Sequence, residues 1–547
     1  MKKRNNNITS RLEVLDKDKI FDMLVIGGGI SGACILWDGV LRELSCILVE
    51  KNDYASGTSQ ATSKLIHGGL RYLKNGEISL VKESLDERKI LAKLTPHSIR
   101  PLGFLIPIYD LKNLLLLRAG LTIYDYLSLN KNVDLLSDSL VPNHEYLSKE
   151  QTISEDPNIP RSDLKGSVLY YDYANINPER HTCDFIFSAR RRGARVFNYT
   201  EVKKIEFINN IYHILIYDRL TGVEFLIKSR TIVNSSGPWA DNVDKIILNN
   251  DGANIIRSKG IHIVTRNISQ KHCSIRITKS KKHLFVIPWR NRTIIGTTDT
   301  IYEGNPDNFS VSRNDILNLI EEINDYLNFK VQERDVYFYY GGMRPLVEDG
   351  NNKESNTYNV SRKTEITEHK DSGKPGFITA LGGKYTTSRG LAEKVVDKVC
   401  GILGKGKECS TKVTRLISGN FSDVPSLVRD LKTRYYRLSE EKAYNLAMRY
   451  GSQVYELAEL NKELFLDTQS GIRIQNEEEY YKEEIEYICR FEDVFNLSDF
   501  YFRRSGIGNI GKPKDDTISK INSIVSETLG KSVSKSELAD FNLRFIF

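Results

Sequence analysis

Glycines near the amino end have the spacing of a turn that binds phosphate. Gly27, Gly29 and Gly32 form a GxGxxG set between an apolar run at 21–26 and a stretch at 33–43 that suits a helix. The first glycine permits the turn, the second lets the backbone approach a pyrophosphate, and the third lets helix and strand pack closely. The amino end of such a helix would offer N–H groups and a positive dipole to phosphate.

An acidic residue follows at the spacing that this chemistry needs. Glu50 ends a second apolar run, LSCILVE, and could accept hydrogen bonds from an adenosine ribose, while its charge would repel a 2′-phosphate. Gly28 and Ser31 complete the turn. The unit of about 30 residues predicts a βαβ element that binds a dinucleotide, and the alternative is a structural turn in an unrelated α/β fold.

Two further glycine-rich stretches carry cations. SKLIHGGLRYL, at 63–73, has two adjacent glycines between His67 and Arg71. The glycines allow a close backbone approach, and Arg71 could bind an anion through two hydrogen bonds. The alternative is an ordinary turn beside a solvated cation. TALGGKYTTSRG, at 379–390, precedes a predicted helix. A nicotinamide site needs no second glycine turn so late in the chain, whereas a long flavin dinucleotide could use both.

The intervening patterns predict the elements that hold these turns. ISLVKESLDERKILAKL, at 78–94, has helical spacing, and the apolar runs between 193 and 235 predict an antiparallel meander that feeds a last buried strand at 231–234. A strand-rich segment spans about 260–300. After about residue 405 the pattern is helical and rich in charge, so we place a domain boundary there.

Composition fits a multidomain enzyme in a reducing compartment. The chain has 547 residues, of which 40% are hydrophobic and 27% charged, and its net charge of +7 is too weak an excess to suggest nucleic-acid binding. Its seven cysteines form no CxxC pair, which argues against disulfides and metal fingers and for a cytoplasmic location, and we expect no metal.

Attachment to a membrane surface is left open by one apolar patch. No run reaches the roughly 18 apolar residues of a membrane span, and the basic amino end lacks the apolar core of a signal peptide. Leu114–Leu117, with Leu121 and Ile123, form an apolar patch bordered by Lys112 and Arg118. This patch suits either a helix on a lipid surface or a core helix.

Six motifs in a fixed order resemble one family. They are SKLIHGGLRYL, NSSGPWAD (234–241), SKGIHIV (258–264), FVIPWRNRTIIGTTDT (285–300), YYGGMRPL (339–346) and LGGKYTT (381–387). Together they resemble the FAD-dependent glycerol-3-phosphate dehydrogenases over about residues 20–545. The departures are small: a serine precedes GPW, and the amino end is extended and rich in Asn.

The resemblance implies a fold and a cofactor. It implies an α/β plus α+β architecture: a Rossmann-like FAD domain of the glutathione reductase and D-amino-acid oxidase type, an antiparallel-sheet substrate cap and a C-terminal helical domain. We assign 1–19 to a basic extension, 20–404 to the FAD domain with its interleaved cap, and 405–547 to the helical domain. Besides the first turn and Glu50, the residues implied for FAD are Thr58, Ser59, Ser63, Leu65, Val202, Ser236, Gly237, Trp239, Gly382, Gly383, Lys384 and Thr386.

The resemblance also implies a cationic substrate site for sn-glycerol 3-phosphate. The residues implied for substrate binding are Arg71, Tyr72, Thr297, Arg344, Arg362 and Lys384, and those implied for catalysis are His262, Arg344 and Lys384. Several cations suit a dianionic phosphate. Arg362 could equally form a surface salt bridge, His262 could be a core residue, and the role of His67 stays open. His262 is a better proton acceptor than an arginine.

Electron transfer from the reduced flavin leaves two alternatives. Related oxidases commonly carry an insertion in the later half, and none is evident here, which favours a membrane quinone over oxygen. We therefore expect peripheral attachment to the inner face of the cytoplasmic membrane, with a homodimer as one option for assembly. The rival functions are a peroxide-forming glycerol-3-phosphate oxidase, an amine or amino-acid oxidase of the same fold, and a non-catalytic flavin-binding protein.

Overall fold

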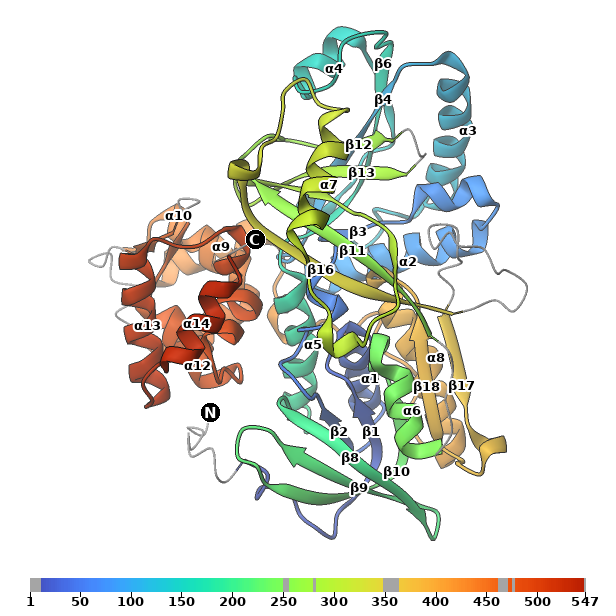
Figure 1. Cartoon of the computed structure of the whole chain (residues 1–547), viewed down its shortest axis with the longest axis vertical. Helices are drawn as coiled ribbons and strands as arrows, with labels where there is room; N and C mark the ends of the chain where they lie inside the picture. Colours follow the sequence, from blue (N-terminus) through green and yellow to red (C-terminus); the bar gives the residue numbers. More distant parts are fainter. Residues whose placement is uncertain are drawn as a thin grey trace.

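Two large sheets, one below the other in Figure 1, organise the chain, and the C-terminal helices lie together along one side. The computed structural model describes residues 11–248, 255–278, 282–347, 364–460, 471–474 and 478–545. The first sheet and its helices form the nucleotide-binding body. The second sheet forms the cap above it.

The first sheet is parallel at its centre, as the buried apolar runs predict. Its parallel strands lie in the order β18–β10–β1–β2–β7, with β17 antiparallel at the edge. Because both faces of the central strands β1 and β2 are covered, these two strands consist almost entirely of apolar residues. The strands are β1 (Ile20–Ile26), β2 (Cys46–Val49), β7 (Arg195–Phe197), β10 (Glu224–Asn234), β17 (Thr364–Glu368) and β18 (Phe377–Gly382).

Different layers cover the two faces of this sheet. Helices α1 (Ile30–Leu41), α5 (Pro178–Arg191) and α8 (Ser388–Leu403) pack on one face. The predicted meander, β8 (Thr200–Ile208) and β9 (Ile211–Asp218), lies on the other face with α6 (Ala240–Leu248). The meander prediction is confirmed. The predicted last strand is the second half of β10, whose first half pairs antiparallel with β9 and whose end pairs parallel with β1.

The cap is built on the second sheet. Its strands lie in the order β15–β11–β14–β13–β12–β4–β6–β3, with β16 beside β11 and β5 beside β6, and the described pairs are antiparallel except β12 with β4. The strands are β3 (Leu65–Ile66), β4 (Ile99–Ile108), β5 (Glu145–Ser148), β6 (Gly166–Asn175), β11 (Ile255–Thr265), β12 (Cys273–Ile277), β13 (His283–Trp289), β14 (Arg292–Gly296), β15 (Thr300–Tyr302) and β16 (Val336–Val347).

Several helices pack on or beside the second sheet. The predicted helix at 78–94 is α2 (Ile78–Leu94), and α7 (Arg313–Asn324) packs apolar residues on β11 and β14. Helix α3 (Leu111–Leu127) has two apolar faces. Leu121 and Tyr124 are buried, whereas Leu115 and Leu116 are 66% and 60% exposed. The core interpretation therefore holds for one face of the helix, and the other face is exposed, so attachment to a lipid surface stays a prediction.

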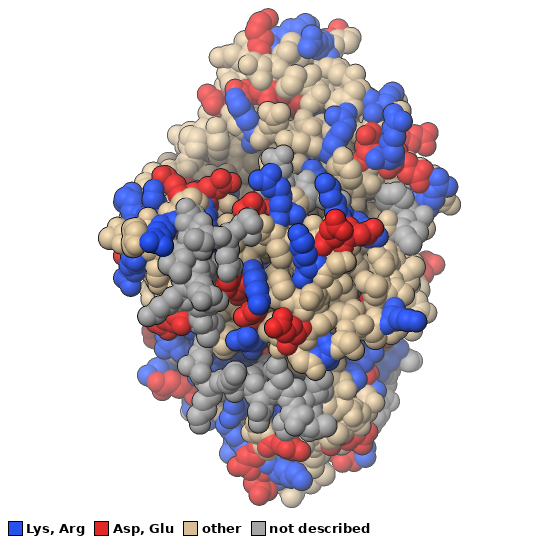
Figure 2. All heavy atoms as spheres, turned by 90° about the vertical axis from the view of Figure 1, so that its left-hand side faces the viewer, with Lys and Arg blue, Asp and Glu red and all other residues tan. Residues whose placement is uncertain are grey.

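The C-terminal helices share a core with the cap. Phe502 stacks on Phe338 of β16, with ring centroids 5.7 Å apart, inside a cluster that joins both parts. On the face shown in Figure 2, the described Lys, Arg, Asp and Glu side chains are intermingled. None of the described helices is long and apolar enough to cross a membrane. The helices are α4 (Lys149–Glu155) in the cap and, in the C-terminal part, α9 (Val424–Arg434), α10 (Glu440–Tyr450), α11 (Val454–Leu460), α12 (Lys482–Phe491), α13 (Asp515–Leu529) and α14 (Lys535–Leu543).

Two glycine-to-alanine substitutions separate close packing from helix propensity. A Cβ on Gly32 would lie 2.0 Å from the carbonyl oxygen of Gly27, so Gly32→Ala must push α1 off β1 and lower the free energy of unfolding by about 1–3 kcal/mol or more. In Gly120→Ala, in α3, the new Cβ would meet no atom within 4 Å. Because alanine favours a helix more than glycine does, this substitution should raise the free energy of unfolding by about 0.5–1 kcal/mol. Urea denaturation measures both, and equal effects would contradict the close-packing account.

Candidate active site

A long cleft opens where the first glycine turn faces the second. Its volume is about 1550 Å³ when its open mouth is included. It runs from the end of β2 past the amino end of α1 to the turn after β18. The predicted cofactor residues that line it are Gly27, Gly29, Ser31, Glu50, Thr58, Ser59, Val202, Ser236, Gly237, Trp239, Gly382, Gly383 and Lys384.

The first glycine turn brings backbone amides to the cleft. Gly27 has φ +110°, a conformation that side chains rarely adopt, and a Cβ there would lie 2.7 Å from the carbonyl oxygen of Ser235. Helix α1 begins at Ile30, earlier than the sequence predicts, because the glycine turn itself forms its amino end. Its N-cap is Gly29, which has no side chain to cap the helix. The hydroxyl of Ser59 accepts a hydrogen bond from the amide of Ile30 at 2.9 Å.

Glu50 holds the end of β2 against this turn. Its carboxylate accepts hydrogen bonds from the amide of Gly28 at 2.7 Å and from the amide of Asn52 at 2.8 Å. Burial raises the pKa of Glu50, and these two amides oppose that shift. The carboxylate is thus fixed in direction and also lines the cleft.

Five of the predicted cofactor residues do not line the cleft. Gly28 and Gly32 lie behind the turn, and Leu65 is buried in the core of the cap. Ser63 points to His262, with 2.9 Å between its hydroxyl and Nε2. The hydroxyl of Thr386 accepts a hydrogen bond from the amide of His67 at 3.3 Å.

The HGGLRYL loop is held by buried polar groups. The amide of Gly68 donates to the hydroxyl of Tyr124, in α3, at 3.0 Å, and that hydroxyl donates to Asp172, in β6, at 2.7 Å. Gly69 has φ +79°, and a Cβ there would lie 2.6 Å from the Tyr72 ring. The adjacent glycines therefore serve a left-handed turn and a close approach.

Two of the predicted substrate cations meet at Tyr72. Lys384 Nζ lies 3.9 Å from the centre of the ring and Arg71 Cζ 4.7 Å from it, and Arg71 donates to the Tyr72 hydroxyl at 2.9 Å. Lys384 also donates to the hydroxyl of Ser84 at 3.0 Å. Burial lowers the pKa of His67 to about 3, and the charges of Lys384 and Arg71 add to the shift.

The other predicted substrate and catalytic residues that the structure describes, His262, Thr297 and Arg344, lie together on one face of β11. The His262 ring stacks on Tyr340 at 4.9 Å, and Gly296 leaves room for it, since a Cβ there would lie 2.5 Å from the ring. Arg344 donates to the hydroxyl of Thr297 at 2.7 Å, over Gly260.

The histidine in this group is neutral. Burial and the charges of Arg344 and Lys64 hold the pKa of His262 well below its ordinary value. Nδ1 of this ring has no hydrogen-bond partner among the described residues. His262 can therefore accept a proton.

Sequence reasoning missed several neighbours of these residues, and one prediction lies outside the structure. Arg362 is outside the described residues. Ser84 lies within an ordinary helical pattern, so nothing marked it as a partner of Lys384. His283, whose pKa burial and Arg71 lower to about 4, stands in an apolar strand. Tyr340 belongs to the YYGGMRPL motif and could have been picked out there.

The residues present fit FAD. Glycine turns border the cleft from two directions, with a helix whose N-cap is a glycine at one turn and Lys384 at the other. Gly382 and Gly383 have φ +74° and +82°, so the second turn also approaches with bare backbone. A long dinucleotide needs such close approach at both ends, and Glu50 would supply the acceptor for a ribose hydroxyl.

Known families match nearly the whole chain. The family model of FAD-dependent oxidoreductases matches residues 22–396, and the model of the C-terminal domain of alpha-glycerophosphate oxidase matches residues 409–536. The glycerol-3-phosphate dehydrogenase of Synechocystis is 32% identical over 507 residues, which cover 90% of this chain and 89% of that protein. The aerobic glycerol-3-phosphate dehydrogenase of Staphylococcus haemolyticus is 30% identical, with 95% and 94% covered.

Solved structures share the fold. The glycerol-3-phosphate dehydrogenase of Bacillus halodurans, complexed with FAD, superposes with a TM-score of 0.74 at 24% identity and covers 99% of this chain and 97% of its own. The L-alpha-glycerophosphate oxidase of Mycoplasma pneumoniae, with FAD bound, has a TM-score of 0.54 at 17% identity, with 72% and 97% covered. The predicted architecture, a Rossmann-like FAD domain with a cap and a C-terminal helical domain, is confirmed.

Glu50→Gln tests the acid at the end of β2. The amide keeps the shape but loses the charge and one acceptor oxygen, so the dissociation constant for FAD should rise about tenfold. Glu201→Gln is a matched control, because Glu201 also lines the cleft but pairs with Lys203 at 2.9 Å. Quenching of flavin fluorescence measures both affinities. An unchanged affinity in Glu50→Gln would remove Glu50 from the cofactor site.

Proposed function

The chain belongs to the family of FAD-dependent glycerol-3-phosphate dehydrogenases, and from this premise we propose that it oxidises sn-glycerol 3-phosphate to dihydroxyacetone phosphate and passes the electrons to a membrane quinone. Bound FAD supplies the acceptor for the hydride that leaves C2 of the substrate. The observation that carries the proposal is the position of Lys384. This residue lines the cofactor cleft, and its ammonium group lies over the same Tyr72 ring as the guanidinium of Arg71.

The phosphate of the substrate would lie between Arg71 and Lys384. Two cations on one aromatic ring favour a dianion, and the planar guanidinium provides two-point recognition. The Tyr72 hydroxyl, which accepts a hydrogen bond from Arg71, fixes the direction of that guanidinium. Thr297 and Arg344 would orient the other end of the substrate beside His262.

His262 is the residue that we assign to take the hydroxyl proton. It is neutral because burial and Arg344 hold its pKa low, so its lone pair is available. A dianionic substrate would offset the positive charge nearby and raise that pKa, which strengthens the base only when substrate is bound. Ser63, hydrogen-bonded to Nε2, orients the ring.

The outer face of α3 supports a membrane as the partner. Leu115, Leu116, Ile123 and Tyr126 are 66%, 60%, 44% and 72% exposed, which is costly in water and favourable in a lipid interface. Lys112 and Arg118, both exposed, border this face. A quinone dissolved in the membrane is the acceptor that such a surface would reach.

Oxidation of the substrate by this chain can be read directly from the flavin. Anaerobic sn-glycerol 3-phosphate should bleach the flavin absorbance, whereas D-amino acids and sarcosine should not. A flavin bleached by an amine instead would favour an amine oxidase of the same fold. A flavin that no alcohol or amine bleaches would favour a non-catalytic protein.

Arg71→Ala tests the phosphate site. FAD should stay bound, while the KM for sn-glycerol 3-phosphate rises about 10- to 100-fold, the value of one or two hydrogen bonds to a charged group. Arg313→Ala, which removes an exposed arginine paired with Glu333, should leave KM unchanged. An unaltered KM in Arg71→Ala would indicate that Arg71 does not bind the phosphate and that the loop at 63–73 has only a structural role.

The double variant Leu115→Ser with Leu116→Ser tests membrane attachment. Loss of two exposed leucines should abolish cosedimentation with anionic phospholipid vesicles and lower quinone reduction, but leave activity with a soluble dye acceptor unchanged. Val413→Ser with Tyr436→Ser removes two side chains of similar exposure, 65% and 80%, in the C-terminal part and serves as control. Abundant hydrogen peroxide from the purified enzyme in air would contradict a quinone as the electron acceptor and would favour an oxidase that uses oxygen.

A further inference from the structure

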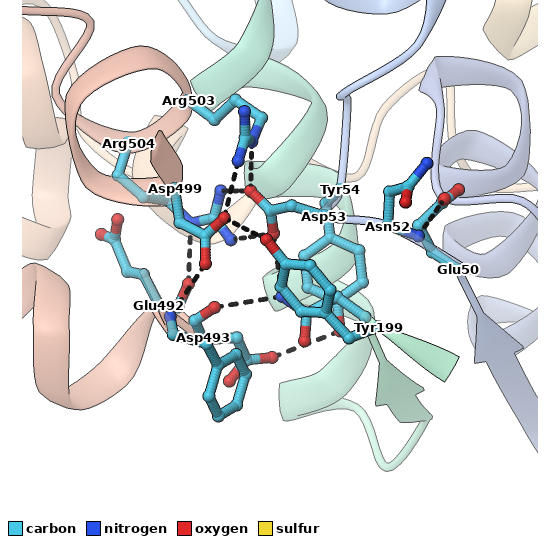
Figure 3. Close-up of polar contacts among 12 residues, drawn as sticks. Glu50, Asn52, Asp53, Tyr54, Tyr199, Glu492, Asp493, Asp499, Arg503 and Arg504 are labelled. Atoms are coloured by element: carbon cyan, nitrogen blue, oxygen red, sulfur yellow. Dashed lines mark hydrogen bonds and ion pairs between the residues drawn. The ribbon is translucent and has the colours of Figure 1, made fainter. Parts of the chain in front are cut away.

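The turn that follows Glu50 is fixed by the C-terminal part of the chain. Asp53 is 1% exposed, and Figure 3 shows two arginines converging on its carboxylate. Arg504 donates to both oxygens, at 2.8 and 2.9 Å, and Arg503 donates to one of them through Nε. Asn198 donates to the other at 2.8 Å. The carboxylate of Asp53 is therefore held from several directions.

A second connection runs through Tyr199, at the start of the meander. Its backbone amide donates to the carbonyl of Asn52 at 2.7 Å, and its hydroxyl donates to Asp499 at 2.5 Å. Arg503 donates to the same oxygen of Asp499 at 2.6 Å. The π-helical turn Asp499–Arg504 thus contacts the Glu50 turn both directly and through Tyr199.

A third connection lies behind the first glycine turn. The hydroxyl of Tyr54 donates to Asp493 at 3.3 Å, and the Tyr54 ring would be 3.0 Å from a Cβ on Gly28. The amide of Ala55 donates to the carbonyl of Gly28 at 3.0 Å. A shift of residues 52–55 therefore moves Gly28, whose amide orients the Glu50 carboxylate.

A buried network of this kind is not by itself evidence of a large contribution to stability. Burying charges costs free energy that their attraction recovers only in good geometry, and apolar side chains of similar volume often stabilise a fold as well or better. What the arginines add is a fixed direction: a bidentate contact specifies the position of Asp53 closely. Neither Asp53 nor the two arginines are among the residues that line the cofactor cleft.

We propose that Arg503 and Arg504 are positioning residues for the adenosine end of the cofactor. They hold Asp53, the Asp53 turn holds Glu50 and Gly28, and the affinity for FAD depends on this chain of contacts without any contact between the arginines and FAD. The C-terminal domain thereby has a role in cofactor retention. The inference rests on the proposed function, which requires bound FAD, and on the contact between Glu50 and the adenosine ribose that the fit of FAD to the cleft implies.

Substitutions at Arg504 test the proposal by binding rather than by turnover. FAD is titrated into the apo form of the full chain, with ADP as a competitor that probes the adenosine end alone. Arg504→Met should raise the dissociation constants for FAD and for ADP by the same factor, about tenfold or more. Arg504→Lys keeps the charge but not the two-point contact, so its dissociation constants should lie between those of the wild type and of Arg504→Met. The KM for sn-glycerol 3-phosphate at saturating FAD should not change.

A matched control separates positioning from general destabilisation. Arg276→Met breaks another buried pair, Arg276 with Asp156 at 2.9 Å, in the cap. Both methionine variants should lower the thermal unfolding midpoint of the apo protein, but only Arg504→Met should raise the dissociation constants. If Arg504→Met yields no soluble protein, Tyr199→Phe, which removes one hydroxyl of the network, decides by the same criterion with an expected change of about threefold.

Three results would overturn the proposal. The first is an unchanged FAD affinity in the soluble Arg504 or Tyr199 variant, and the second is a weaker FAD affinity with unchanged ADP affinity. The third is a loss of ADP affinity in Arg504→Met but not in Glu50→Gln, which would exclude the route through Glu50. Failure of the proposed oxidation appears elsewhere, as a wild-type flavin that the substrate does not bleach.

Discussion

The carbonyl oxygen of Gly27 lies where a Cβ on residue 32 would stand, only 2.0 Å away, and the cleft begins at this contact. Because α1 can approach β1 so closely, its first amides open onto the carboxyl end of the parallel sheet instead of onto a side-chain layer. The second turn, after β18, also presents bare backbone to the cleft, at Gly382 and Gly383. Between the two turns lies a groove whose lining is rich in Gly, Ser and Thr and also includes apolar side chains such as Ile30 and Trp239, which suits a long, flat, phosphorylated ligand.

Electrostatics divides the groove into two ends. At the end near β2, where we place the adenosine, Glu50 accepts hydrogen bonds from two backbone amides and Lys51 pairs with Asp307. At the flavin end Arg71 and Lys384 stand around one tyrosine ring, and the histidines nearby have lowered pKa values, so they do not add positive charge at neutral pH. The field at that end is therefore positive enough to attract a dianion and still leaves an imidazole able to accept a proton.

Local patterns predicted much of the fold, and long-range pairing limited the rest. The strand, glycine turn and helix at 20–41, helix α2 and the meander follow from periodicity within short windows. The family motifs predicted that the loops at 63–73 and 381–387 are neighbours of one cofactor, and in the structure residues 382–385 of the second loop line the cleft. The motifs did not identify which side chains face the cleft, because Leu65 and Thr386 are directed by packing against strands and loops that lie far away in sequence.

Helix α3 is a second case in which the sequence predicts an element but not which of its faces is buried. Its sequence is apolar around most of its circumference, so periodicity could not tell a buried face from an exposed one. The structure separates them, since Tyr124 reaches the HGGLRYL loop while Leu115 and Leu116 face outwards. Likewise, a single sequence contains no signal that Asp53 pairs with an arginine 451 positions later.

That separation has a consequence for biosynthesis. A ribosome delivers the amino end first, so the Glu50 turn leaves the exit tunnel long before Arg503 and Arg504 are made. Until then the carboxylate of Asp53 lacks its counter-ions, and the turn that carries it stays in contact with water. On the proposal above, the nucleotide-binding fold, although it begins near residue 20, would reach its final form only after Arg503 and Arg504 have been made, and tight binding of FAD would wait for that step.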